Sequence, residues 1–148
     1  FELWTQPEHI ARWWGPEGFR QANCAVDLRP GGRFALDLIG PDGNTYPCRG
    51  RYQTIDPPRL LVLDGLTEPG MIEHPCGSGL PPRATVRIEF ETSGSGTLLT
   101  IRSLLASADD AEAAIANGFG VGWSMSLECI ARLLADDGTQ PTQPENKT

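Results

Sequence analysis

Residues 33–55, RFALDLIGPDGNTYPCRGRYQTI, decide the fold of this chain. Phe34, Leu36 and Leu38 alternate with side chains that would lie on the opposite face of a strand. The turn sequence PDGN follows at 41–44 and leads into a second strand-like run. Period-two alternation of this kind is typical of antiparallel strands with one buried and one wet face. The segment therefore predicts two strands joined by a hairpin.

Similar turn signals occur on both sides of this hairpin. Turn signals rich in Pro and Gly recur at 29–32, 56–58 and 93–96. Together they predict six strands, connected mostly by short hairpins, at 20–28, 33–40, 45–55, 59–66, 83–92 and 97–105. The connection at 67–82 is longer, and its Gly, Pro and Cys content indicates an exposed loop. A lid, an interface element and a plain surface excursion all fit a loop of that length.

Helices are predicted at the N-terminal end. The sequence TQPE at 5–8 is a capping box with Thr5 as N-cap. The helix that it starts would carry the adjacent tryptophans 13–14 and end at the Gly-Pro pair 15–16. Adjacent helical residues point about 100° apart, so one tryptophan is expected in the core and the other at an interface or cavity mouth. Residues 1–4 fit the end of a preceding short helix.

A long amphipathic helix is predicted near the C-terminal end. Acidic residues at 109, 110 and 112 suit a helix start, where negative charge complements the helix dipole. An apolar stripe then follows at three- and four-residue steps: Ile115, Phe119, Trp123, Leu127, Ile130 and Leu134. Three glycines between 118 and 122 interrupt it and require close packing, a kink, or a break between a short and a long helix. Residues 136–148 are polar and predict a flexible tail.

These elements predict an α+β domain. A long helix cannot leave an apolar stripe in water, and six antiparallel strands offer one apolar face. The economical solution places the C-terminal helix across the concave face of a curved sheet, with the two N-terminal helices closing one end. A strongly curved sheet packed in this way leaves space between itself and the helix.

A series of ordered motifs also resembles a known family. They are WTQPEHIARWWGP at 4–16, VDLRPGGRF at 26–34, GPDG at 40–43, GRY at 50–52, IDPPRL at 55–60, GSGTLLTI at 94–101 and GWSMSL at 122–127. The chain resembles the family named after the C-terminal domain of the activator of heat shock protein 90 ATPase, within the START-like (SRPBCC) superfamily. The resemblance covers residues 1–135.

The resemblance implies a helix-grip fold of the START-like, birch-pollen-allergen-like type. This fold has a curved six- to seven-stranded antiparallel sheet wrapped around a long C-terminal helix, with two short N-terminal helices. It also implies a strand before those two helices, which we expect upstream of Phe1.

Aromatic side chains on the expected inner surface are candidates for a cavity lining. The six candidates are Trp14, Phe34, Tyr52, Phe90, Phe119 and Trp123. Each is also compatible with ordinary core packing. Tyr52 stands apart, because a hydroxyl inside an apolar cavity needs a partner or a ligand. The leading hypothesis is a domain that binds a small apolar or amphipathic molecule.

Residues that could carry catalysis are few. His9 and His74 are the chain's two histidines, and His9 is expected to face solvent. His74 and Cys76 lie in the 67–82 loop without a third orienting group, so no catalytic residue is predicted. No ligand spacing supports a metal, and no phosphate-binding loop or other cofactor site is predicted. An enzyme of the polyketide cyclase or aromatase kind, using the same cavity, remains an alternative.

Charged residues on the strands have structural interpretations. Asp27 and Arg29 share a strand face beside the Pro-Gly-Gly turn, which predicts a salt bridge or a turn-fixing role rather than catalysis. Arg49 and Arg51 are predicted on the outer, solvated face of their strand.

Composition limits the partners. The 148 residues carry a formal net charge of −7, which argues against nucleic-acid binding. No apolar run is long enough to span a membrane, and the four cysteines are far apart, as in a reduced cytoplasmic protein. In the heat shock activator a separate domain binds the chaperone, and no such domain is matched here, which makes a chaperone contact doubtful. A chaperone-associated stress protein and a homodimer stay open as alternatives.

Overall fold

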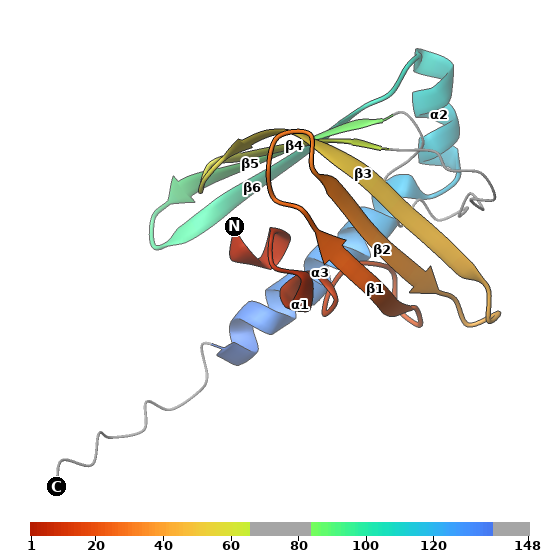
Figure 1. Cartoon of the computed structure of the whole chain (residues 1–148), viewed down its shortest axis with the longest axis horizontal. Helices are drawn as coiled ribbons and strands as arrows, with labels where there is room; N and C mark the ends of the chain where they lie inside the picture. The colour runs from red at the N-terminus through yellow and green to blue at the C-terminus, as the bar shows by residue number, and fades with distance from the viewer. Residues whose placement is uncertain (66–83, 138–148) are drawn as a thin grey trace, which may run out of the picture.

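The computed structural model describes residues 1–65 and 84–137. Six antiparallel strands form one curved sheet, and a long helix crosses its concave side (Figure 1). The strands are β1 (Arg20–Val26), β2 (Arg33–Ile39), β3 (Thr45–Asp56), β4 (Leu60–Gly65), β5 (Thr85–Ser93) and β6 (Gly96–Leu104). The helices are η1 (Glu2–Trp4), α1 (Pro7–Ile10), α2 (Ala108–Ala116) and α3 (Phe119–Asp137). The predicted α+β helix-grip architecture is confirmed.

The sheet is a simple meander, with strands in the order β1-β2-β3-β4-β5-β6. In the central hairpin Phe34 lies opposite Gly50 and Ile39 lies opposite Thr45. Gly43 has a φ of +79° in the connecting turn, a conformation that glycine adopts without steric cost. The turn signals therefore placed every described hairpin correctly.

Two register shifts bend the sheet. The first lies between Ala22 and Ala25 on β1, and the second lies between Tyr52 and Thr54 on β3. Asn23, inside the first shift, has a φ of +52°, which side-chain-bearing residues rarely adopt. An extra residue in one strand of a pair increases local twist, so these positions help to curve the sheet around α3.

Alternation along the strands separates a buried face from a wet one. Every second residue of β2 is buried, and β3, β4 and β5 contribute to the same layer. The buried inner-face side chains of these strands are Phe34, Leu36, Leu38, Cys48, Tyr52, Leu61, Leu63, Val86 and Ile88. This layer is the sheet's half of the core.

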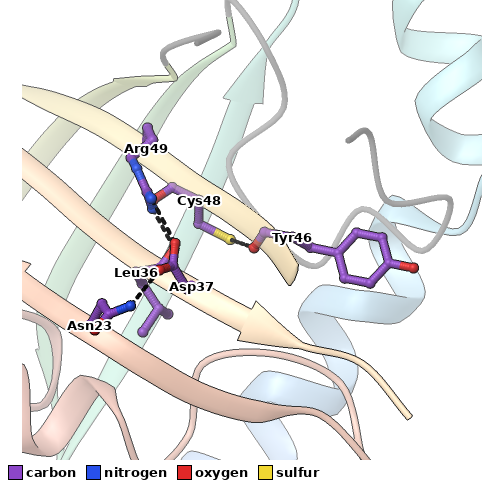
Figure 2. A network of polar contacts seen from close by, with 6 residues as sticks. All are labelled: Asn23, Leu36, Asp37, Tyr46, Cys48 and Arg49. Atoms are coloured by element: carbon purple, nitrogen blue, oxygen red, sulfur yellow. Dashed lines mark hydrogen bonds and ion pairs between the residues drawn. The ribbon is translucent and has the colours of Figure 1, made fainter. Parts of the chain in front are cut away.

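A polar network fixes the outer face of β1, β2 and β3 (Figure 2). Arg49 Nη2 lies 2.6 Å from Asp37 Oδ1, and Asn23 donates to Asp37 Oδ2 at 2.7 Å. Arg49 also donates to the carbonyl of Leu36 at 2.7 Å. The Asp37 and Arg49 side chains are only 13% and 17% exposed, so the prediction of a solvated Arg49 was wrong. Arg51, on the same strand, is exposed as predicted and donates to the Gly31 carbonyl.

The turn between β1 and β2 is held by close packing. A Cβ on Gly32 would lie 2.0 Å from the carbonyl oxygen of Asp27, so no other residue fits there without a backbone shift. The predicted salt bridge between Asp27 and Arg29 is present at 2.9 Å.

The N-terminal helices are shorter than predicted. The N-cap of α1 is Gln6, without a side-chain cap, and the Thr5 hydroxyl instead donates to the Phe1 carbonyl. The helix ends at Ile10, so Trp13 and Trp14 lie in the following turns rather than on a helix. Both are buried, which corrects the expectation that the two tryptophans face different environments. Both rings are buried because the segment is covered on two sides: Trp13 packs on Trp4, and Trp14 packs on Phe34 and Trp123.

The C-terminal stripe is divided between two helices. Gly118 has a φ of +82° and ends α2, so the predicted alternative of a short and a long helix is the observed one. Phe119, Trp123, Leu127 and Ile130 lie in or against the core as expected. Ile115 and Leu134 are 75% and 58% exposed, so the predicted stripe was wrong at both ends. The helix break redirects the α2 end, and Leu133 packs on the core in place of Leu134.

The polar tail was predicted from residue 136, but α3 continues to Asp137. Residues 138–148 and the 67–82 connection, with His74 and Cys76, lie outside the described residues.

We predict that the Asp37–Arg49 pair contributes stability that depends on pH. Burial alone would raise the pKa of Asp37, but hydrogen bonds from Asn23 and Arg49 and the charge of Arg49 lower it overall. The contribution should be complete above the unfolded-state pKa of about 3.9 and be lost as pH falls through the lower folded-state value. Asp37→Asn should cost about 3 kcal/mol in urea unfolding at neutral pH and less below about pH 4.

The matched control is Asp27→Asn, whose partner Arg29 is exposed; it should cost under about 1 kcal/mol. An equal cost of Asp37→Asn at neutral pH and below about pH 4 would contradict this interpretation.

Candidate ligand-binding site

A cluster of aromatic rings fills the space between the N-terminal segment, the sheet and α3. Trp4, at the end of η1, is its centre. The ring centroids of four neighbours lie close to that of Trp4: Trp13 at 4.5 Å, Trp123 at 5.9 Å, Phe90 at 6.2 Å and Trp14 at 6.3 Å. The Trp4 and Trp123 planes are inclined by only 23°, so these two rings are stacked. One residue thus contacts the turn after α1, strand β5 and helix α3.

Five of the six predicted cavity residues belong to this ring network. Trp14 lies 4.9 Å from Phe34 and 5.5 Å from Trp123, measured between ring centroids. Phe119 lies 6.3 Å from Trp123, and Phe90 joins through Trp4. Trp14, Phe34 and Phe119 are buried, whereas Phe90 and Trp123 are half-buried. The structure therefore brings together residues from four elements that are far apart in the sequence.

Tyr52, the sixth predicted residue, lies in the same core on β3. Its side chain is 1% exposed. Its hydroxyl has no hydrogen-bond partner in the part of the chain that the structure describes. Burial, and to a smaller extent the nearby Cys24, raises the pKa of Tyr52 above its ordinary value. The phenol is therefore neutral at physiological pH and carries a proton that it could donate.

Two further ring donors share this condition. The indole nitrogens of Trp14 and Trp123 are buried, and neither finds an acceptor within residues 1–65 and 84–137. Trp13 is the contrast, because its indole nitrogen donates to the Leu3 carbonyl at 2.7 Å. A buried polar group without a partner costs about 1–3 kcal/mol, and such groups need an explanation. The candidate site therefore contains three buried donors with no protein acceptor among the described residues.

Sequence reasoning missed the central residue. The sequence predicts Trp4 only as the end of a short helix and not as the centre of the cluster. His9 was also misplaced: it is half-buried, and its Nδ1 is buried without a partner in the described chain, rather than facing solvent. Nothing in the local pattern indicates either fact, because both depend on how the N-terminal segment folds back on the sheet.

The Cys24 thiol, close to Tyr52, is not activated as a nucleophile. Burial, and then the negative charge of Glu8, raises the pKa of the Cys24 thiol to about 11. A thiol of that pKa is almost wholly protonated at neutral pH and is a poor nucleophile. Among the described residues, no cluster of three His, Cys, Asp or Glu side chains could hold a metal ion.

Fold and site together define a helix-grip domain whose concave face is occupied by aromatic side chains. The sequence profile of the family described as "Activator of Hsp90 ATPase homolog 1-like protein" matches residues 1–135, and the chain belongs to this family. No curated protein matches the chain.

Solved structures share the fold. Protein NE0264 from Nitrosomonas europaea is 25% identical, covers 94% of this chain and 86% of its own, and superposes with a TM-score of 0.79. CalU16 from Micromonospora echinospora is 26% identical over 92% of this chain and 67% of its own, with a TM-score of 0.59. The AHSA1 protein from Silicibacter pomeroyi is 19% identical over 93% of this chain and 88% of its own, with a TM-score of 0.67, and supports the fold alone.

The helices can also be compared with what a membrane requires. None of those in the described ranges combines the length and the apolar character needed to cross a bilayer.

We predict that Tyr52→Phe does not destabilise the ligand-free protein. The substitution removes a buried hydroxyl that has no described partner and keeps the ring in place. Removing such a group is neutral or stabilising, so the free energy of unfolding in urea should stay the same or rise by up to about 1 kcal/mol. A loss of more than about 1 kcal/mol would mean that the hydroxyl has a protein partner.

Proposed function

We propose that this protein binds a small apolar or amphipathic molecule at the aromatic cluster between the sheet and α3. One observation carries the proposal: three of the six aromatic candidates, Trp14, Tyr52 and Trp123, hold a buried polar atom without a partner in the described chain. A ligand that accepts hydrogen bonds would satisfy these atoms.

The unpartnered atoms limit the chemistry of that ligand. An indole nitrogen can only donate a hydrogen bond. Tyr52 is held neutral, so its hydroxyl can donate as well. The matching ligand therefore carries acceptor oxygens, such as carbonyl groups, on an apolar framework that packs against the rings. Ligand sites commonly combine an aromatic lining with a few placed polar groups.

Binding rather than catalysis is proposed because the described residues of the site supply hydrogen-bond donors and no activated group. The Cys24 thiol is protonated at neutral pH. The family's name refers to activation of a chaperone ATPase, and no contact among the described residues supports carrying that activity over to this chain.

The proposal can be tested with two probes of nearly the same shape, fluorenone and fluorene. Fluorenone carries a carbonyl oxygen where fluorene has a methylene group. All four tryptophans of the chain, Trp4, Trp13, Trp14 and Trp123, belong to the cluster, so intrinsic fluorescence reports directly on the site. We expect fluorenone to bind about tenfold more tightly than fluorene, the effect of about one hydrogen bond.

Tyr52→Phe supplies the matched control. The variant should weaken fluorenone binding several-fold and leave fluorene binding unchanged, because only the first probe can accept the phenolic proton. Isothermal titration calorimetry should give the same ranking. The proposal would be contradicted if neither probe changed tryptophan fluorescence at saturating concentration. It would also be contradicted if fluorenone bound the original protein and the Tyr52→Phe variant with equal affinity.

A further inference from the structure

A separate cleft lies outside the aromatic cluster. Its volume is about 430 Å³, and it runs between residues 12–21 and the face of α3 that carries residues 125–132. The amide of Gly15 donates to the Ser126 hydroxyl at 3.3 Å, which fastens the two walls together. Gly15 and Pro16 are buried and line the cleft. The cleft shares no residue with the six aromatic candidates and falls within the size range of small-molecule sites.

Charges of both signs line this cleft. Arg12 and Glu17 belong to the N-terminal wall, and Glu128 and Arg132 belong to α3. Glu128 and Arg132 have the four-residue spacing that favours an ion pair on a helix. The Arg132 guanidinium lies instead beside the Cys129 sulfur, at 3.7 Å. Within the described ranges, none of the four charged groups has an ion-pair partner, unlike Arg49, Arg59, Arg87 and Arg102 elsewhere on the sheet.

An apolar surface accompanies these charges. Phe19 is half-buried on one wall, and Met125 is 37% exposed on the other. All four charged side chains are exposed, and the two guanidiniums and two carboxylates line one concave space together with these apolar residues. Methionine is also flexible enough to adapt to ligands of different shape.

We propose that this cleft binds a small zwitterion with an apolar side chain, of the chemical class of dipeptides. The guanidiniums of Arg12 and Arg132 bind the carboxylate, a contact that arginine makes with two parallel hydrogen bonds. The carboxylates of Glu17 and Glu128 bind the ammonium group, and Phe19 and Met125 contact the side chain.

Charge also decides against other ligands. The carboxylates of Glu17 and Glu128 repel a purely anionic molecule, and the two arginines repel a purely cationic one. Repulsion of the wrong partner is a common source of specificity. The site therefore selects molecules that carry both charges, independently of what binds at the aromatic cluster.

Leucyl-leucine is a suitable probe, titrated into isotope-labelled protein and followed by NMR. We expect saturable shifts of amide signals from residues 15–21 and 125–132. N-acetyl-leucyl-leucine lacks the ammonium group and leucyl-leucine amide lacks the carboxylate, so each should bind at least tenfold more weakly. Equal affinity of all three peptides, or no saturable shift at these residues, overturns the proposal.

Two exposed arginines allow a matched comparison of variants. Arg132→Gln should weaken leucyl-leucine binding at least tenfold, whereas Arg59→Gln, at the β3–β4 turn, should leave it unchanged. Bound leucyl-leucine should also slow maleimide labelling of Cys129 in the cleft wall but not of Cys24, measured by peptide mass spectrometry. Unchanged binding in Arg132→Gln, or equal protection of both thiols, overturns the proposal.

Discussion

The contact of Trp4 with Trp123 joins the parts of this domain that the sequence keeps furthest apart. Trp4 lies on η1 and Trp123 lies on α3, and their stacked rings are 5.9 Å apart. The same indole of Trp4 also contacts Trp13, Trp14 and Phe90. Aromatic pairs contribute about 0.5–1.5 kcal/mol beyond their buried area, so one side chain with four ring neighbours stabilises contacts between several elements at once. Together with the Trp14–Trp123 ring contact and the Gly15–Ser126 hydrogen bond, it holds the N-terminal segment against the helix.

The two faces of the sheet differ in whether their buried polar groups have hydrogen-bond partners among the described residues. On the outer face, Asp37 and Arg49 are largely buried but satisfy one another and the neighbouring backbone. On the inner face, the Tyr52 hydroxyl and two indole nitrogens have no acceptor within the described chain. A fold normally pairs its buried donors, as the outer face shows. These unpaired donors lie at the site where we propose that a ligand binds.

Most of the fold could be predicted from local pattern. Phe34, Leu36 and Leu38 alternate with a period of two, which requires a strand whatever the rest of the chain does, and the observed β2 differs from its prediction by one residue. The N-terminal helix was harder, because the capping box at Thr5 is only a local signal, whereas the observed helix has Gln6 as its N-cap and ends at Ile10. Gly118 carried an ambiguous signal, since a glycine in a helix allows a kink or a break equally.

The candidate site could be predicted only as a set of rings. Alternation placed Phe34, Tyr52 and Phe90 toward the interior, and helical spacing did the same for Phe119 and Trp123. Neither rule says which donors remain unpaired, because that depends on distances between elements. Trp13 and Trp14 are neighbours in sequence, yet within residues 1–65 and 84–137 Trp13 reaches an acceptor, the carbonyl of Leu3, and Trp14 does not. The charged cleft was missed for the same reason: its walls are formed by segments more than 100 residues apart.

A double-mutant cycle between Trp4 and Trp123 tests most directly whether their contact holds the domain together. Trp4→Leu, Trp123→Leu and the double variant would be unfolded in urea beside the original protein. We expect the sum of the stability losses of the two single variants to exceed the loss of the double variant by about 1 kcal/mol. This difference is the coupling energy of a stacked aromatic pair. Losses that add within about 0.3 kcal/mol would contradict the central role given to this contact.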